Sequence, residues 1–450
     1  MQRREFLGTA IAGLAAAQPA GRPNFIVIYT DDQGYGDLGA LGGKDVKTPH
    51  LDRLAASGAL LRDWHTNSPV CSPSRASLLT GKYPQNAGIP QILFSRPEFD
   101  VPGLRRGETT LPGELKKLGY RTAAVGKWHL GSAPHSRPLA QGFDEWFGFY
   151  SGWIDYYSHR YYTLGGQPVY HDLWRADATG EQEVFADREY QTEMLGREAQ
   201  AFLKKQKPGQ PFFLYLAFGA PHYPMMAPAK YVERFPASMD RDRRMHCAMM
   251  AAIDDQVGEL VALLGRLKLT NTVIFFQSDN GSTREERSDH RGRPYRGGSN
   301  GEWRGYKGSL WEGGQRVGGI LNWQGRIKPG TQPEGIGMTM DILPTFVKWA
   351  GGTPPADADG TDLTAWLMEG GKPPRETAYW DYDGLGAVRQ GEWKLLENWR
   401  DGLAVPTEKG IWLSNLRQDP GETKNFAAEH PGLVRELKAK LDAWRASWRK

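Results

Sequence analysis

Acidic side chains at the ends of two apolar runs are the first groups in this sequence that could do chemistry. Asp31 and Asp32 follow one run, and Asp279 and Asn280 follow another. Taken singly, such residues are usually turn or cap residues. Three carboxylates in one crevice repel one another unless a cation joins them, and all four side chains are oxygen donors. Oxygen donors suit Ca²⁺ or Mg²⁺ and do not suit zinc, so the pattern predicts a site for a hard divalent ion.

A cysteine supplies the second chemical feature. Cys71 opens the segment CSPSRASLLTGK, in which Pro73 suits the first turn of a helix, Ser72 can cap its free N–H groups and Gly81 can end it. A thiol at the start of a helix lies where backbone N–H groups favour negative charge. Free cysteine is more often a small buried residue, but serine, proline and arginine are poor core neighbours. We therefore interpret Cys71 as a site residue, with Arg75 one turn further along.

Basic and imidazole groups follow other apolar runs. Lys127 and His129 stand two residues apart, so on an extended segment they would point to the same side. His222 follows a third run, and Lys307 lies in a glycine-rich stretch. A lone histidine is usually structural, and a lysine in a glycine-rich loop is usually solvated. These four residues are therefore candidates for binding an anion only if the fold brings them together.

The elements that must position these residues follow an α/β pattern. An apolar strand with polar groups at its C-terminal end is predicted four times, and helices are predicted between the strands. In open α/β sheets ligands bind at the carboxyl ends of the strands, so the repetition predicts one crevice. The predicted strands are 24–30, 120–125, 212–218 and 272–277, and the main predicted helices are 111–118, 187–205 and 243–267.

Beyond about residue 375 the alternation of predicted strands and helices stops. A hairpin is predicted at 387–396, a further strand at 411–413 and an amphipathic helix from 431. The predicted fold class is therefore α/β, with a large, mainly parallel sheet flanked by helices, followed by a smaller C-terminal antiparallel sheet with a helix. We expect the catalytic domain at 18–375 and the smaller domain at 376–450.

The Cys71 segment also carries a resemblance. Cys-x-Pro-Ser-Arg followed by Leu-Thr-Gly-Lys resembles the signature of the type I, arylsulfatase-like sulfatases, which have the alkaline-phosphatase-like fold. In that family a formylglycine-generating enzyme converts the cysteine to formylglycine, whose hydrate is the nucleophile that attacks sulfur. The resemblance implies that Cys71 is the precursor of this group, and that Arg75 holds the hydrate or the sulfate.

The resemblance assigns a role to each of the other candidates. It implies that one Ca²⁺, with Mg²⁺ as the alternative, is bound by the formylglycine oxygen together with Asp31, Asp32, Asp279 and Asn280. It implies that Lys127 contacts the hydrate and that His129 takes a proton from its second hydroxyl. His222 and Lys307 match family residues that contact the sulfate and assist the departing oxygen.

Composition limits the partners and the location. The chain has 450 residues and a net charge of +4, too small a surplus to predict a nucleic-acid surface. Cys247 falls in an apolar stretch of a predicted helix, so no disulfide is expected. Arg3-Arg4 and an apolar run to Ala17 resemble a twin-arginine export signal, too short to span a bilayer. We expect a signal peptide at 1–17, no stable membrane anchor, and a periplasmic or extracellular enzyme.

The expected activity is hydrolysis of a sulfate monoester of a small molecule or carbohydrate. Aromatic residues between 146 and 157, with His159, would favour a sugar ring if they face the cleft, and packing is an equal alternative. Asp289-His290 lies in an arginine-rich loop and is left out of the site. Two alternatives stay open: a phosphonate or phosphodiester hydrolase of the same fold, and an inactive binder of sulfated glycans in which Cys71 is never converted.

Overall fold

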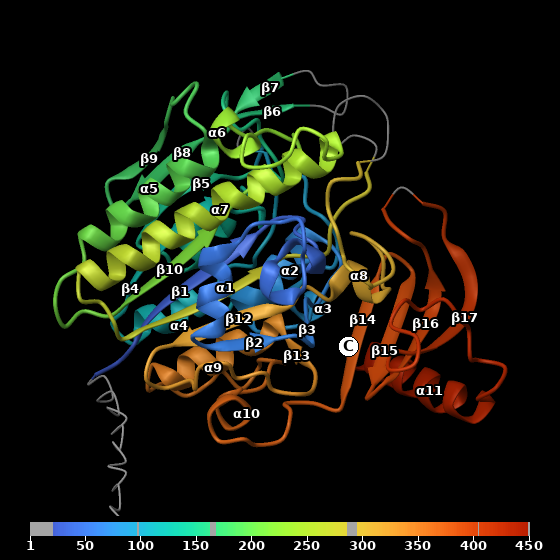
Figure 1. Ribbon diagram of the computed structural model, residues 1–450. Coiled ribbons are helices and arrows are strands. Elements are labelled where there is room, and N and C mark those ends of the chain that lie inside the picture. The colour runs from blue at the N-terminus through green and yellow to red at the C-terminus, as the bar shows by residue number, and fades with distance from the viewer. Residues whose placement is uncertain (1–20, 97–98, 163–167, 286–294, 404, 449–450) are drawn as a thin grey trace, which may run out of the picture.

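A nine-stranded sheet dominates the computed structural model, which describes residues 21–96, 99–162, 168–285, 295–403 and 405–448 (Figure 1). Its strand order is β2-β12-β11-β1-β10-β4-β5-β8-β9. The five strands from β11 to β5 run parallel, and the strands at both edges are antiparallel. The predicted large, mainly parallel sheet is confirmed.

The apolar runs form the central strands, which are buried on both faces as parallel strands usually are. The bounds of the nine strands are β1 Asn24–Thr30, β2 Ala59–Leu61, β4 Arg121–Lys127, β5 Glu145–Phe149, β8 Trp174–Asp177, β9 Gly180–Glu183, β10 Phe212–Ala217, β11 Thr272–Ser278 and β12 Gly319–Trp323.

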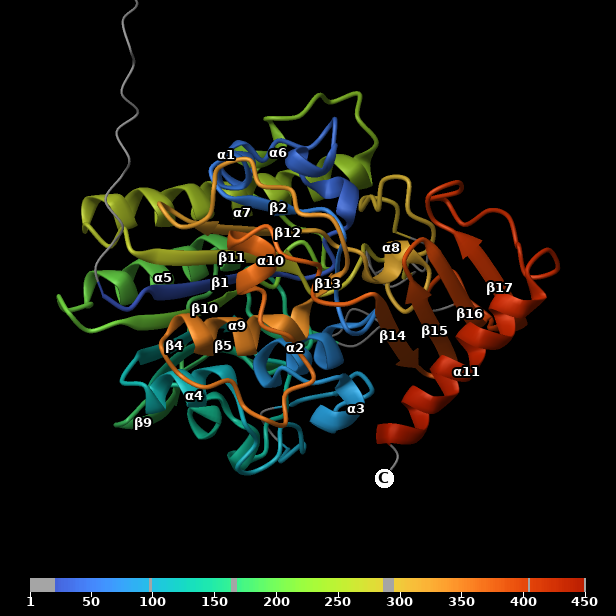
Figure 2. The same ribbon diagram turned by 90° about the horizontal axis from the view of Figure 1, so that it is seen from below.

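Alternate residues of each strand face two separate cores. On β1, Ile26 and Ile28 pack in a core with α1, α5 and α7, whereas Val27 packs in a core with α2, α4 and α9. Figure 2 shows the sheet between α7 on one side and α4 and α9 on the other. The helices are α1 Pro49–Ala56, α2 Cys71–Thr80, α4 Leu111–Lys117, α5 Gln191–Lys204, α7 Arg241–Arg266 and α9 Ile342–Trp349.

Short elements fill the connections. Two two-stranded pairs are β3 Trp64–His65 with β13 Gly337–Met338, and β6 Arg160–Tyr162 with β7 Pro168–His171; the short helices are α3 Pro84–Ala87, α6 Ala229–Val232, α8 Glu312–Gln315 and α10 Thr364–Met368. Cys247 is buried in α7, as predicted, and both cysteines are free. Within the described residues, no helix combines the length and the apolar character needed to cross a membrane.

The C-terminal sheet stands beside the large one (Figures 1 and 2). Its four strands form an antiparallel meander, and α11 packs on one of its faces through Leu437 and Leu441. The predicted small antiparallel sheet with a terminal helix is confirmed, although β14 and most of β17 were not predicted. The elements are β14 Thr377–Tyr382, β15 Leu385–Gln390, β16 Trp393–Trp399, β17 Glu408–Asn415 and α11 Pro431–Trp448.

A buried ionic cluster connects the C-terminal sheet to β3 and α8, two short elements that precede it in the chain. Glu312, the first residue of α8, accepts hydrogen bonds from Lys394 Nζ of β16 at 2.8 Å and from His65 Nε2 of β3 at 2.9 Å. Glu312 and Lys394 are fully excluded from water. We call this group the Glu312 cluster; its members are Asp63, His65, Glu312, Arg316, Arg389 and Lys394.

Candidate active site

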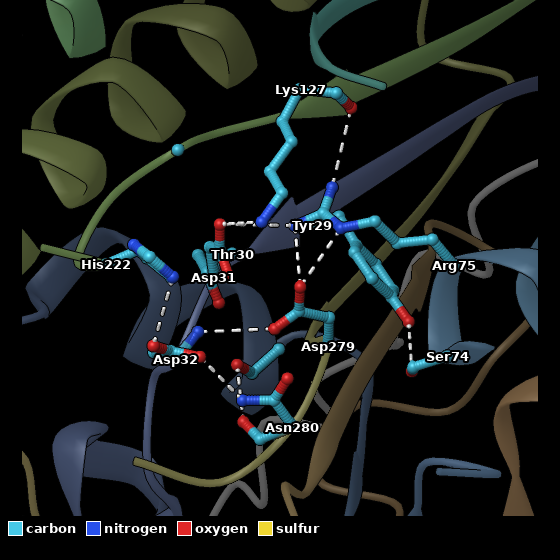
Figure 3. A network of polar contacts seen from close by, with 12 residues as sticks. Tyr29, Thr30, Asp31, Asp32, Ser74, Arg75, Lys127, His222, Asp279 and Asn280 are labelled. Atoms are coloured by element: carbon cyan, nitrogen blue, oxygen red, sulfur yellow. Dashed lines mark hydrogen bonds and ion pairs between the residues drawn. The ribbon is translucent and has the colours of Figure 1, made fainter. Parts of the chain in front are cut away.

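The candidate residues meet at the carboxyl edge of the central strands (Figure 3). Asp31 and Asp32 directly follow β1, and Asp279 directly follows β11, which pairs with β1. Lys127 is the last residue of β4, and His222 follows β10 by way of a short loop. The parallel order of these strands therefore brings together residues that lie up to about 250 positions apart in the sequence.

Three cations pair with the three carboxylates. Lys127 Nζ lies 2.5 Å from Asp31 Oδ2. Lys307 Nζ lies 2.9 Å from Asp32 Oδ1.

Arg75 completes the set. Its Nε and Nη2 both donate to Asp279 Oδ2, at 3.0 and 2.7 Å, and Nη2 also lies 3.8 Å from Asp31 Oδ2. All six side chains of these pairs are buried, so the charges interact with little screening by water.

Cys71, Asn280 and His222 lie among these pairs. Cys71 Sγ and carboxylate oxygens of Asp31 and Asp279 fall within 4.8 Å of one another. Asn280 Nδ2 donates to Asp32 Oδ1 at 2.7 Å, and His222 Nε2 lies 3.6 Å from Asp32 Oδ2 (Figure 3). The structure therefore brings these candidates into one buried polar cluster.

His129 is placed differently from the expectation. β4 ends at Lys127, and His129 has a left-handed backbone with φ of 57°, so the segment is not extended through both residues. His129 is buried, and its Nε2 lies 2.6 Å from the Leu93 carbonyl oxygen. A carbonyl only accepts, so Nε2 carries the proton, and Nδ1 has no hydrogen-bond partner among the described residues. Burial and the charges of Lys127 and Arg75 hold the His129 pKa well below its ordinary value.

The start of α2 also differs from the prediction. The helix begins at Cys71 itself, Val70 precedes it without a side-chain cap, and Ser72 Oγ instead accepts the Leu93 N–H at 3.1 Å. Gly81 ends the helix in a left-handed conformation, as predicted. Burial raises the pKa of the Cys71 thiol although nearby lysines oppose it, so the helix start does not produce a thiolate.

Unsatisfied oxygens show that this cluster fits a hard cation. Asp31 Oδ1 and Asn280 Oδ1 are buried and have no hydrogen-bond partner within the part of the chain that the structure describes. Burial and the charge of Asp279 raise the pKa of Asp31 to about 8, against the opposing charges of Lys127 and Arg75. Burial also raises the pKa of Asp32. The raised pKa values mean that the buried negative charges of the two aspartates are not fully neutralised by protein groups, and a bound cation would neutralise them. Oxygen donors with unused lone pairs are the ligands that Ca²⁺ and Mg²⁺ prefer.

Sequence reasoning missed several residues that touch the candidates. Glu285 Oε2 lies 3.6 Å from Lys307 Nζ, and Tyr215 Oη accepts a hydrogen bond from Arg75 at 3.3 Å. Glu285 lies in the loop after β11 that also carries Asn280, which is the one signal that could have identified it.

The C-terminal sheet reaches the site through backbone atoms. The Leu403 N–H donates to the Lys307 carbonyl at 3.1 Å, and Arg400 Nε donates to the Gly308 carbonyl at 2.9 Å. No local motif predicts these two contacts, because they depend on how the segment after β16 packs against the Lys307 loop.

Of the two alternatives for the aromatic residues between 146 and 157, packing holds for those on β5. Trp146, Phe147 and Phe149 belong to β5 and are buried in the cores. Trp153 does contact a candidate, because its ring stacks on His222 with centroids 6.0 Å apart and planes 13° apart. The excluded Asp289-His290 pair and the expected signal peptide lie outside the described residues.

The sheet, its helices and the polar groups at its edge define a protein of the alkaline-phosphatase-like superfamily. The family model named Sulfatase matches residues 23–352. N-acetylgalactosamine-6-sulfatase of Canis lupus familiaris is 36% identical over 455 residues, which cover 96% of this chain and 82% of that protein. The chain therefore belongs to the sulfatase family and is a hydrolase of sulfuric esters.

Other relatives agree with this assignment. Arylsulfatase A of Homo sapiens is 32% identical over 494 residues, covering 98% of this chain and 92% of the relative. The crystal structure of Ps i-CgsB in complex with k-i-k-neocarrahexaose superimposes with a TM-score of 0.82 at 30% identity, covering 94% of this chain and 93% of that one. The similarity thus extends beyond the Cys71 segment to nearly the whole chain.

Proposed function

We propose that this sulfatase hydrolyses a sulfate monoester of a carbohydrate, with a nucleophile derived from Cys71 and one bound Ca²⁺. The observation that carries the proposal is the set of unsatisfied oxygens on Asp31, which lies beside Cys71, and on Asn280, in a cluster with three buried cations. The carbohydrate part is supported by the similarity to N-acetylgalactosamine-6-sulfatase and to a structure in complex with a neocarrahexaose.

In this proposal Asp31, Asp32, Asp279 and Asn280 hold the cation, together with the oxygen that replaces the Cys71 sulfur on conversion by a formylglycine-generating enzyme. When bound, the ion supplies positive charge for a sulfate oxygen, and formylglycine supplies a hydrated aldehyde as nucleophile. Mg²⁺ is the alternative ion, because the donor set suits both.

The buried cations hold negative charge at the reacting centre. Lys127 and Lys307 both lower the Cys71 pKa through their charges, so each lies close enough to stabilise an anion at this position. Arg75 is fixed by its two hydrogen bonds to Asp279, so its charge is oriented before the substrate arrives. Such preorganised charge stabilises a transition state without reorganising the site.

The two histidines can move protons at defined atoms. His129 keeps a neutral ring with its lone pair on Nδ1, so Nδ1 is the atom that would take a proton from the nucleophile. His222 Nδ1 donates to the Tyr223 carbonyl at 2.8 Å, which directs Nε2 toward Asp32. From there His222, with Lys307, would meet the departing oxygen.

The first test is chemical identification of residue 71. Mass spectrometry of the peptide that contains Cys71 should find the aldehyde, and 4-nitrophenyl sulfate should be cleaved with a higher kcat/KM than 4-nitrophenyl phosphate. The reversed preference would favour the phosphonate or phosphodiester hydrolase. A thiol at full occupancy in protein from its native host, with no turnover, would favour the sulfated-glycan binder.

The second test concerns the metal. Exhaustive chelation should abolish sulfate-ester hydrolysis, and Ca²⁺ should restore it more fully than Zn²⁺, because the four protein ligands are all oxygen donors. Full activity in the chelated enzyme would contradict the metal assignment. Assay against a panel of sulfated mono- and oligosaccharides would then identify the substrate.

We also propose export through a twin-arginine signal at 1–17, supported by Arg3-Arg4 and the apolar run behind them. Replacement of both arginines with lysine should retain the enzyme in the cytoplasmic fraction. Unchanged export of that variant would contradict the twin-arginine route.

A further inference from the structure

A second cluster of metal-ligating side chains lies in the insertion between β5 and α5, the region of β6 to β9 in Figure 1. One ligand atom from each of His159, His171 and Asp187 falls within 4.8 Å of the others. His159 is fully buried and His171 is 7% exposed, whereas Asp187 is exposed. The cluster therefore combines two buried imidazoles with a carboxylate on the solvent side.

The imidazoles have unused nitrogen atoms. His171 Nε2 is buried and has no hydrogen-bond partner among the residues that the structure describes. The two nitrogens of His159 are also buried, and the backbone of Glu189 is a polar neighbour at the margin of hydrogen-bond geometry. Buried polar atoms without partners are costly and uncommon in native proteins, so a free nitrogen on each of two neighbouring imidazoles indicates a missing ligand.

The tautomer of His171 is set for metal binding. Its Nδ1 lies 2.8 Å from Glu183 Oε1, so the proton resides on Nδ1 and the lone pair on Nε2. A carboxylate that holds the outer N–H of a histidine is the usual support for a metal-binding imidazole. Phe185 stacks on the same ring with centroids 4.6 Å apart, which further fixes its plane.

We propose that His159, His171 and Asp187 bind Zn²⁺ at a site separate from the proposed calcium site. Two imidazoles and one carboxylate form a donor set that suits zinc and that calcium disfavours. Zinc ligands in a tetrahedron lie about 3.4 Å apart, given bond lengths of about 2.1 Å. The exposed Asp187 side chain can rotate to close that geometry, and water can occupy the fourth position.

The ion would hold together three segments that support the active site. His159 belongs to the loop before β6, His171 ends β7, and Asp187 lies in the turn before α5. The loop of His159 also contains Tyr156, whose single hydroxyl proton is shared between the carbonyl oxygens of Gly219 and His222, at 2.9 and 2.8 Å. Zinc would therefore stabilise the loop whose Tyr156 holds the backbone of Gly219 and His222, and it would take no direct part in the reaction.

The test measures zinc on the full enzyme. Protein purified without a metal-affinity column should retain about one equivalent of zinc by elemental analysis. After chelation and reloading with Ca²⁺, titration with Zn²⁺ should show one saturable site and raise the temperature of unfolding. Co²⁺ in place of Zn²⁺ should give the visible absorption of a tetrahedral ion.

Matched variants locate the site. Asp187→Asn changes an exposed residue and should fold normally, yet bind Zn²⁺ at least tenfold more weakly and lose the thermal shift. Glu189→Gln, two residues away and also exposed, and His135→Ala should bind as the wild type does. Absence of saturable binding would overturn the proposal. So would binding that survives Asp187→Asn and His171→Ala but is lost in Asp31→Asn, because that result places zinc in the catalytic cluster.

Discussion

Two buried ionic clusters lie on neighbouring parts of this molecule, and they are satisfied to different degrees. In the Glu312 cluster both carboxylate oxygens accept hydrogen bonds, from Lys394 on one side and His65 on the other. Despite burial, the charges of Lys394 and Arg389, with the hydrogen bond from His65, hold the pKa of Glu312 well below its ordinary value. In the active site Asp31 has one oxygen without a partner and a pKa of about 8.

Burial and metal-like spacing do not distinguish the two clusters. Ligand atoms of Asp63, His65 and Glu312 also fall within 4.8 Å of one another. There, however, both Glu312 oxygens accept hydrogen bonds, and the buried atom left without a partner is a nitrogen, His65 Nδ1. In the candidate active site two buried oxygens, Asp31 Oδ1 and Asn280 Oδ1, have no hydrogen-bond partner among the described residues. The comparison teaches that buried oxygens with unused lone pairs, and not burial or spacing alone, mark the place where a cation would complete the site.

The largest expected effect is on chemistry without loss of fold. Cys71→Ser should reduce steady-state hydrolysis of 4-nitrophenyl sulfate roughly 10³-fold or more. A serine hydroxyl can attack sulfur while its proton passes to the departing oxygen. It lacks the second hydroxyl through which hydrated formylglycine releases sulfate, so turnover should stop after one event.

Mass spectrometry of the variant after incubation with substrate should find sulfate on the serine peptide, and Cys71→Ala should carry none. The unfolding transition of Cys71→Ser should match that of the wild type. Sustained multiple turnover by this variant would contradict the proposed nucleophile.

The opposite effect is expected in the Glu312 cluster. Glu312→Gln leaves Lys394 buried without its counter-charge and should lower the free energy of unfolding by about 3–5 kcal/mol, measured by urea denaturation. Asp31→Asn, compared in the presence of chelator, should lower stability less than Glu312→Gln does, because burial and the charge of Asp279 raise the pKa of Asp31 and already disfavour its charged form without a cation. Equal destabilisation by both substitutions would remove the distinction between the clusters.

Acid should weaken the structural cluster in a defined pH window. Arg316 and Arg389 outweigh burial and lower the pKa of Asp63 to about 2, from an ordinary value of 3.8. A depressed folded-state pKa contributes stability that is complete above about pH 4 and is lost as the pH falls toward 2. Through its depressed pKa, Asp63 should contribute about 2 kcal/mol to the free energy of unfolding. Unfolding free energies measured across this window should fall less steeply in Asp63→Asn, and an unchanged slope would refute the assignment.

The smallest expected effect tests the contact between the C-terminal sheet and the Lys307 loop. Arg400→Gln removes the hydrogen bond to the Gly308 carbonyl and should lower kcat/KM by about threefold, because Lys307 is then less firmly positioned. Arg417→Gln, which changes an exposed arginine in the turn after β17, should leave kcat/KM unchanged. A loss equal to that of Lys307→Ala would mean that Arg400 itself contacts the substrate.

The sequence predicted those parts of the fold that depend on local patterns of apolar and polar residues. The apolar runs at β1, β10 and β11 and the long helix α7 were predicted within two residues of their bounds. Asp31 and Asp279 were placed together because parallel strands end at a common edge. The start of α5 was predicted four residues early, because Asp187 and Arg188 form a turn with a left-handed backbone at Arg188.

Contacts set by tertiary packing could not be predicted. The antiparallel pairing of β12 with β11 depends on a chain reversal that no motif marks. Glu312 and Lys394 are ordinary charged residues in the sequence, and their burial follows only from the docking of the second sheet. The strand was predicted to end at residue 125, before Gly126, but β4 continues to Lys127, and the left-handed backbone of His129 has no signal in the sequence.

The contact between Leu403 and Lys307 also sets an order in time. Cys71 leaves the ribosome about 330 residues before Leu403, which at about 5–20 residues per second is an interval of roughly 15 to 65 seconds. The Lys307 loop cannot receive its hydrogen bonds from Leu403 and Arg400 until that interval is over. All ten residues of α2 are buried in the finished protein. A modifying enzyme that needs the Cys71 segment in an open conformation therefore has a limited time to act, and the length of the chain that follows Cys71 sets that time.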